Sequence, residues 1–308
     1  VLAIFMGGFT YKTYERSPVW RNDETLSLTD VEISVGSAKV NMSAGLSALK
    51  LGRRVVDTVE CCKIYKKPHV PCPKIVMNND TMDCCNLLGK DTARCNEILH
   101  SDSLVRREWF LKALKFGRTS ISIYPAYSHA MVVLGNAFYE LNYIDSAVIW
   151  FKRCLEVNPQ FGDCKRNLEV ASDKARDLGM YKIADIGYST LLKFDKNNPA
   201  LYAKAGELAG RYLGDIPRAY TLIKEGLKID TGNADLMTKM GVVYGLLGKY
   251  DSALIFFHRI MERFPDDANN YINLAATYHR LGREDLARAF YQKACSLNPS
   301  LCANHPKN

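Results

Sequence analysis

Apolar residues in this chain recur at the three- and four-residue spacing of amphipathic helices. The stretch AMVVLGNAFYEL at residues 130–141 shows this spacing, and similar stretches follow at nearly constant distance. Gly or Asn stands at the corner after each stretch, as suits the left-handed residue that ends a helix. Pro ends several of the following helices, since Pro cannot continue the hydrogen-bond ladder. The pattern predicts an all-α chain of repeated helix pairs.

One alanine in the second helix of each predicted pair marks the register of the repeat. Its successive positions are 34, 37, 35, 34 and 34 residues apart. A small residue, such as Gly135 or Gly241, stands twelve residues before three of these alanines and allows a neighbouring helix to approach closely. One helix pair cannot bury its apolar face alone, so the pairs must stack. The register alanines are Ala113, Ala147, Ala184, Ala219, Ala253 and Ala287.

This period and its corner, alanine and proline signature resemble the tetratricopeptide repeat. The match is strongest over residues 128–159, 234–265 and 268–299, and it is looser over 162–199 and 200–232. The resemblance implies an α-solenoid of about six repeats in a right-handed superhelix, with the first helices lining its concave face.

The predicted domain organisation has four parts. Residues 1–36 hold the end of a transmembrane helix and a linker, 37–125 form a first repeat split by a Cys-rich insertion at 53–106, 128–301 form five repeats, and 302–308 are a tail. The opening helix of the first repeat is expected to end at Gly52.

Ten cysteines in 308 residues favour an oxidising compartment. Cys154 with Cys164 and Cys295 with Cys302 flank helix corners where a disulfide fits, and we favour disulfides there over unpaired core cysteines. For the cysteines of the insertion three hypotheses stay open: disulfides, buried free thiols, or a zinc site that includes His69. These six are Cys61, Cys62, Cys72, Cys84, Cys85 and Cys95.

The charge of +8 is spread along the chain rather than gathered in a stripe, which argues against a nucleic-acid partner. The sequence contains no phosphate-binding glycine loop, HExxH or GxSxG motif, and its histidines lack metal-ligand spacing. We therefore predict a binding scaffold with no catalytic residue, no cofactor and no metal in this chain.

The first helices of the repeats carry the candidate partner-binding residues. Their amides, cations and acids suit an extended peptide, although the same residues are also compatible with a solvated surface without a ligand. Chaperone-binding tetratricopeptide domains use a carboxylate clamp of Lys, Asn, Asn, Lys and Arg. Asn136 and Asn167 match its two Asn residues and Lys204 stands at the Arg position, but neither Lys of the clamp is matched. A co-chaperone role is therefore disfavoured. The candidates are His129, Asn136, Tyr139, Arg166, Asn167, Lys204, Glu207, Arg211, Asp235, Lys239, Asn269, Asn273 and His279.

The segment before the repeats gives the most specific indication of function. VLAIFMGGF at residues 1–9 is apolar, and residues 14–45 resemble the junction between membrane helix and repeats in transmembrane and tetratricopeptide-repeat O-mannosyltransferases and their bacterial relatives. Val35-Gly36 departs from the usual Pro-Asn of that family. The residues that match are Trp20, Asp23, Glu24, Thr25, Leu26, Ser37, Ala38 and Lys39.

That resemblance implies a protein- or peptide-binding region on the periplasmic or lumenal side, attached to the membrane through the N-terminal helix. Sugar transfer would belong to a membrane part upstream of Val1, so it stays open whether the parent protein is an enzyme. The alternative is a free-standing scaffold for complex assembly with no link to glycosylation.

Overall fold

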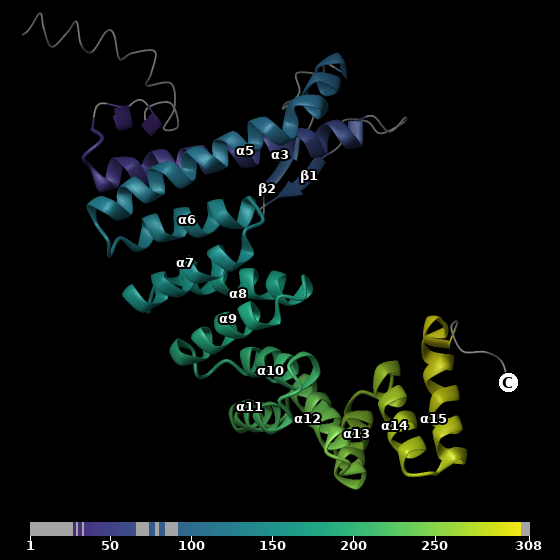
Figure 1. Ribbon diagram of the computed structural model, residues 1–308. Helices are drawn as coiled ribbons and strands as arrows, with labels where there is room; N and C mark the ends of the chain where they lie inside the picture. The colour runs from purple at the N-terminus through teal and green to yellow at the C-terminus, as the bar shows by residue number, and fades with distance from the viewer. Residues whose placement is uncertain are drawn as a thin grey trace, which may run out of the picture. The chain divides into compact units, whose positions relative to one another are not determined.

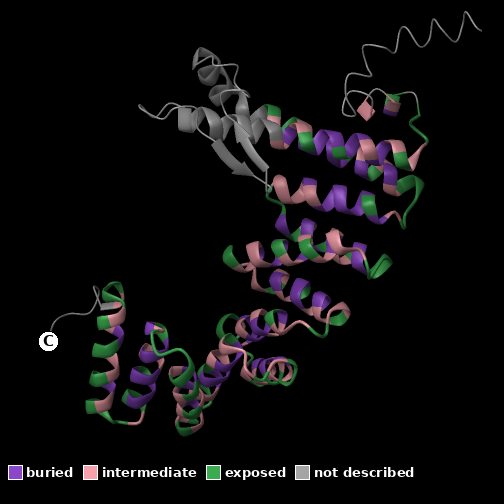
Figure 2. Cartoon of the chain, turned by 180° about the vertical axis from the view of Figure 1, so that it is seen from behind, coloured by how far each residue is buried: buried purple, intermediate pink, exposed green. Residues whose placement is uncertain are grey.

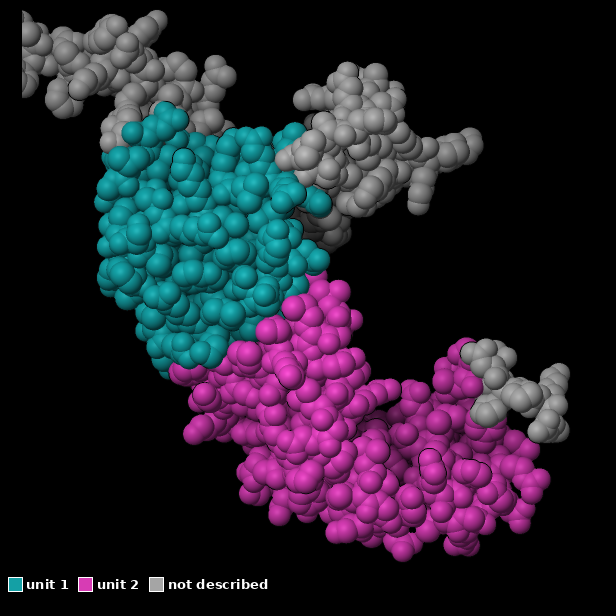
Figure 3. All heavy atoms as spheres, viewed as in Figure 1, with its two compact units in different colours: residues 1–171 teal, residues 172–308 magenta. Residues whose placement is uncertain are grey.

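The computed structural model describes the backbone of residues 27, 28, 30–32, 34–65, 74–77, 80–83 and 92–302, and the side chains of residues 27, 28, 30–32, 34–53 and 105–301. The chain divides into two compact units, residues 1–171 and residues 172–308 (Figure 3). In the described ranges of both units, helix pairs follow one another along the chain (Figure 1). This arrangement confirms the predicted all-α solenoid of helix pairs.

Unit 1 begins with the long pair α3 and α5, and α6 packs against α5 and α7. A two-stranded antiparallel hairpin, with Lys74 opposite Asp83, lies between α3 and α5 in the chain and was not predicted. The elements are α3 (Ala38–Tyr65), β1 (Lys74–Met77), β2 (Asp80–Asp83), α5 (Thr92–Ile123), α6 (Ser128–Glu140), α7 (Ile144–Val157) and the first part of α8 (Gly162–Asp177).

Unit 2 contains the end of α8 and three further complete helix pairs. First helices α10, α12 and α14 alternate with second helices α11, α13 and α15, and each first helix packs against its own second helix. The elements are α9 (Tyr181–Phe194), α10 (Pro199–Glu207), η2 (Leu208–Tyr212), α11 (Ile216–Ile229), α12 (Ala234–Leu246), α13 (Tyr250–Arg263), α14 (Ala268–Arg280), α15 (Glu284–Leu297) and η3 (Pro299–Cys302).

The repeat register predicted from the sequence is found in the core. All six register alanines are buried, and buried positions follow the inner sides of the helices (Figure 2). The small residue of the first helix faces the residue four positions after the alanine. A Cβ atom on Gly241 would lie 2.5 Å from the Phe257 ring, and Gly135 is covered by Phe151 in the same way. Because the aromatic ring fills the crossing, a larger side chain in place of either glycine would force the helices apart.

The corners between helices adopt the expected left-handed conformation. Asn142 has φ 64°, and the corner glycines 179, 214, 248 and 282 have φ between 69° and 76°. These residues end the first helices of their repeats. Gly and Asn occupy these corners because most other side chains are strained at positive φ.

The first repeat departs from the prediction at Gly52. The helix expected to end there continues to Tyr65, and α5 begins at Thr92, well before Arg107. Gly52 is buried, and a Cβ atom on it would lie 2.5 Å from Phe110. Gly52 is therefore a helix-crossing position, like Gly241, rather than a corner. The domain boundaries proposed for the insertion stay predictions.

The fourth repeat absorbs one extra residue in a π-turn. Thirteen residues separate Gly206 from the register alanine Ala219, whereas twelve separate Gly241 from Ala253. After α10 the chain forms the π-helix η2, in which the Leu213 N–H donates to the Leu208 carbonyl at 3.0 Å. A π-turn holds one more residue than an α-turn, so both ends of the repeat keep their register.

One of the two predicted corner disulfides is present, between Cys154 and Cys164, whose α-carbons are 6.0 Å apart. Cys295 is also disulfide-bonded, while the side chain of Cys302 lies outside the described residues. The six cysteines of the insertion, His69, and the matched junction residues from Trp20 to Leu26 lie outside the described side chains as well. Within the described ranges no helix is both long and apolar enough to cross a bilayer; residues 1–9 lie outside those ranges.

Candidate functional site

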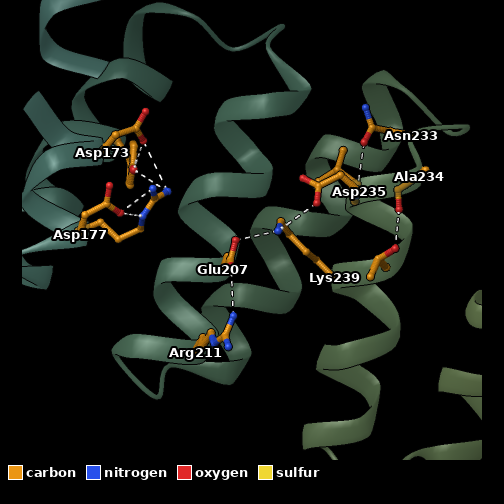
Figure 4. Close-up of polar contacts among 12 residues, drawn as sticks. Asp173, Asp177, Glu207, Arg211, Asn233, Ala234, Asp235 and Lys239 are labelled. Atoms are coloured by element: carbon orange, nitrogen blue, oxygen red, sulfur yellow. Dashed lines mark hydrogen bonds and ion pairs between the residues drawn. The ribbon is translucent and has the colours of Figure 1, made fainter. Parts of the chain in front are cut away.

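Ion pairs join the first helices of successive repeats in unit 2. Asp173 on α8 accepts a hydrogen bond from Lys204 on α10 at 2.8 Å. Glu207 on α10 accepts one from Lys239 on α12 at 2.7 Å (Figure 4). In both pairs the acid directly follows the small residue at the helix crossing of its own repeat, which is Ser172 or Gly206. The lysine lies two residues before the crossing glycine of the next repeat, which is Gly206 or Gly241. We call these four residues the polar ladder. It fixes one first helix against the next on a shared face.

A buried tyrosine supports the first step of the polar ladder. The hydroxyl of Tyr188 on α9 donates to the Asp173 carboxylate, and the Arg176 guanidinium lies 3.6 Å from the same carboxylate. Burial of the ring, followed by the hydrogen bond and charge of Asp173, raises the pKa of Tyr188. Tyr188 therefore stays protonated and acts as a permanent donor to Asp173.

The second step of the polar ladder gathers four charged groups. Lys239 bonds Glu207 and also lies 3.0 Å from Asp235, and Arg211 reaches Glu207 at 3.4 Å. Burial acts to lower the pKa of Lys239, but the hydrogen bond to Glu207 and the charge of Asp235 outweigh it and raise the pKa. Burial acts to raise the pKa of Glu207, but Lys239 and Arg211 lower it. Both members of the pair are thus charged at neutral pH and neutralise each other.

Polar links also join first helices in unit 1. The Asn167 amide of α8 donates to the Asn136 side-chain oxygen of α6 at 3.1 Å, and Arg53 of α3 bonds Glu140 of α6 at 2.7 Å. His129 contributes ring contacts instead. The centroid of its ring lies 5.7 Å from that of Tyr127 and 4.7 Å from that of Phe161.

The structure brings together four of the predicted candidates: Glu207, Arg211, Asp235 and Lys239. It also joins Asn136 to Asn167, whereas Lys204 pairs with Asp173. Several other candidates have contacts close by in the sequence. Arg166 pairs with Asp163 in its own helix, His279 with Glu284 at 2.8 Å, and the Asn269 N–H donates to the Asp267 cap. Burial, followed by the charge of Glu140, raises the pKa of Tyr139, and the Asn273 peptide carbonyl accepts from Thr277. Whether these residues contact a partner stays a prediction.

Sequence reasoning missed Asp173 and Tyr188. The third repeat is three residues longer than the 34-residue period, so its candidates were taken from the start of α8, at Arg166 and Asn167. A signal was nevertheless present. Asp173 directly follows Ser172 and precedes Lys204 by 31 residues, just as Glu207 directly follows Gly206 and precedes Lys239 by 32.

Charged side chains of the first helices pair with one another on this face. Lys204, the nearest match to a clamp cation, is occupied by Asp173. Among the residues that the structure describes, no group of three His, Cys, Asp or Glu side chains is arranged to hold a metal ion. The shared face of ion pairs, amides and exposed side chains on stacked first helices defines a repeat scaffold.

The particular kind of repeat follows from comparison with known proteins. Residues 128–161 and residues 230–300 match models of the tetratricopeptide repeat, so this chain contains tetratricopeptide repeats. No curated protein matches the chain.

Several solved structures are similar to the chain. The crystal structure of MamA protein has 18% identity and a TM-score of 0.47 and covers 59% of this chain and 97% of its own. YrrB, titled a TPR protein with an unusual peptide-binding site, has 18% identity and a TM-score of 0.46, covering 59% and 92%. A thermophilic TPR protein in Thermus thermophilus has 26% identity and a TM-score of 0.41, covering 56% and 92%.

Proposed function

We propose that this chain binds a protein or peptide along the first helices of its repeats. Tetratricopeptide-repeat proteins typically bind such partners. The observation that carries the proposal lies on α14, where the side-chain amides of Asn269 and Asn273 make no hydrogen bond to any residue that the structure describes. An amide offers both a donor and an acceptor, which an extended peptide backbone can satisfy.

Selection of peptides from a random display library on the full chain tests this proposal. Peptides should be enriched whose binding is lost on Ala276→Glu, which places a long anion on the exposed side of α14. Binding should survive Lys293→Glu on the exposed side of the second helix α15, the matched control. If no peptide is enriched, or if enriched peptides bind the Ala276→Glu variant normally, the proposal is wrong.

We further propose that the repeats lie on the periplasmic or lumenal side of a membrane, as the C-terminal part of a glycosyltransferase-like protein. The junction resemblance at residues 14–45 supports this assignment, and so does the Cys154–Cys164 disulfide, because such bonds persist in oxidising compartments. Thiol titration of the denatured, non-reduced protein purified from its native source should find few free thiols. Ten free thiols would remove the compartment argument and favour the alternative, a free-standing scaffold.

A further inference from the structure

The polar ladder stops between α12 and α14. Its positional rule would next join Val242, which directly follows the crossing residue Gly241, to Asn273, which lies two residues before the small crossing residue Ala275. These positions are 31 residues apart, as are Asp173 and Lys204. An aliphatic side chain and an amide therefore occupy the places where the preceding repeats hold an ion pair. The charge pairing that covers the face over α8, α10 and α12 has no counterpart between α12 and α14.

Exposed apolar side chains stand where the polar ladder ends. Val242 is 43% exposed and Leu246, one turn further along α12, is 56% exposed. A Cβ atom built on Gly245 would meet nothing within 4 Å, so the surface beside Leu246 is open. On α14, Ala276 is also exposed and occupies the position equivalent to Val242, directly after the crossing residue. These exposed apolar side chains lie on α12 and α14, first helices that contact each other, and we treat them as one small apolar surface.

Two arginines lie on the helices at either side of this surface. Arg211 lies in η2 at the end of α10, and Arg280 follows Ala275 by five residues, as Leu246 follows Gly241. The Arg211 side chain is 71% exposed and shares Glu207 with Lys239. Arg280 is exposed and makes no ion pair with any residue in the described ranges. The nearest acid on α12, Asp235, lies eleven residues before Leu246, roughly 16 Å along the helix axis.

We propose that this surface binds an extended acidic peptide segment through one leucine-like side chain. This inference rests on the proposed function and names the partner class of the same first-helix face. We call the surface the α12–α14 patch; it consists of Arg211, Val242, Leu246, Asn273, Ala276 and Arg280.

The chemistry of each group in the α12–α14 patch defines the partner. Val242, Leu246 and Ala276 gain from covering by an apolar side chain, because that contact removes their surface from water. Arg211 and Arg280 attract carboxylates on either side of that anchor, and Asn273 supplies a donor and an acceptor to the peptide backbone. Basic segments are repelled by the same two arginines.

A designed peptide provides the test. The probe is a fluorescein-labelled eleven-residue peptide with a central Leu between two Asp-Glu pairs and Gly-Ser ends, and binding to the full chain is followed by fluorescence anisotropy. Replacing the central Leu by Ser, or the acids by Lys, should each weaken binding about tenfold or more. Leu246→Asp and Arg211→Glu should do the same. Ile255→Asp and Arg259→Glu, both at exposed positions on the second helix α13, are the matched controls and should bind as wild type does.

A double variant separates binding from folding. Val242→Glu with Asn273→Lys extends the polar ladder by one step, so this protein should keep its wild-type circular dichroism and melting temperature while losing the probe. Equal affinity of wild type for the Leu and Ser probes, or undiminished binding by the double variant, would overturn the patch.

The library selection described above shows which proposal fails. Enriched peptides that lose binding on Ala276→Glu but lack an acidic, leucine-containing core would overturn the α12–α14 patch and leave peptide binding by the first helices intact. A selection without any enriched peptide, together with no binding of the designed probe, would overturn both.

Discussion

Asp173 offers a sharp test of the polar ladder, because three groups depend on its carboxylate. The buried Tyr188 hydroxyl donates to it, Lys204 lies at 2.8 Å and Arg176 at 3.6 Å. A hydrogen bond to a charged acceptor contributes about 1.5–3 kcal/mol. The Lys204 pair adds at most about 1 kcal/mol, since both side chains are about 30% exposed. We therefore expect Asp173→Ala to lower the free energy of unfolding of unit 2 by about 2–4 kcal/mol.

Native-state hydrogen exchange of the α8–α11 amides is the suitable assay, because repeat arrays do not unfold in a single step. Tyr188→Phe should cost about 1–2 kcal/mol, and the double variant should cost less than the sum of the singles by about 1 kcal/mol or more. Asp177→Ala serves as the control, since Asp177 is 66% exposed and should change stability by less than about 0.5 kcal/mol. Additive effects of Asp173→Ala and Tyr188→Phe would refute the coupling that we infer.

Three further predictions address charge, packing and cross-linking. The pKa of Glu207 is lowered, so the charged carboxylate stabilises the fold above the ordinary pKa of 4.5, and this stabilisation is lost as the pH falls below that value. Circular dichroism of unfolding at decreasing pH should show the loss, and Glu207→Gln should make the loss smaller. Gly241→Ala should destabilise by about 1–3 kcal/mol because of Phe257, whereas Gly245→Ala, on the open side of the same helix, should be neutral or stabilising by up to about 1 kcal/mol in urea unfolding. Cys164→Ser should cost about 2–3 kcal/mol in unit 1, and peptide mapping of the non-reduced protein should recover the linked Cys154–Cys164 pair.

Most of the fold could be predicted from the sequence because a few positions in each repeat determine how its helices pack. The register alanines are buried, and Asn142 and four corner glycines have positive φ, since those sites tolerate few alternatives. The first repeat could not be predicted in detail. Gly52 followed by a long insertion is typical of a helix-ending corner. A glycine buried within a helix, on which an aromatic ring such as that of Phe110 packs, looks the same in the sequence.

The candidate site was only partly predictable, because cross-repeat pairs depend on register. Lys204, Glu207 and Lys239 were identified as polar residues of first helices, but their mutual neutralisation was not. That outcome depends on which acid lies opposite each lysine, and the three extra residues of the third repeat obscured Asp173. A spacing of 31 or 32 residues from an acid to a lysine captures both steps and can be sought in other repeat sequences.

The polar ladder also determines where binding energy can come from. A carboxylate that approached Lys204 or Lys239 would have to displace Asp173 or Glu207, and exchanging one charged acceptor for another gains little free energy. Affinity for an acidic partner must then arise at Arg280, at the exposed N–H groups that Arg211 does not direct to Glu207, and at uncovered apolar side chains. Raising the salt concentration should therefore weaken binding of an acidic peptide only by screening its attraction to Arg211 and Arg280. The affinity of the Arg211→Glu variant should depend less on salt than that of wild type, whereas Lys204→Met should leave this salt dependence unchanged.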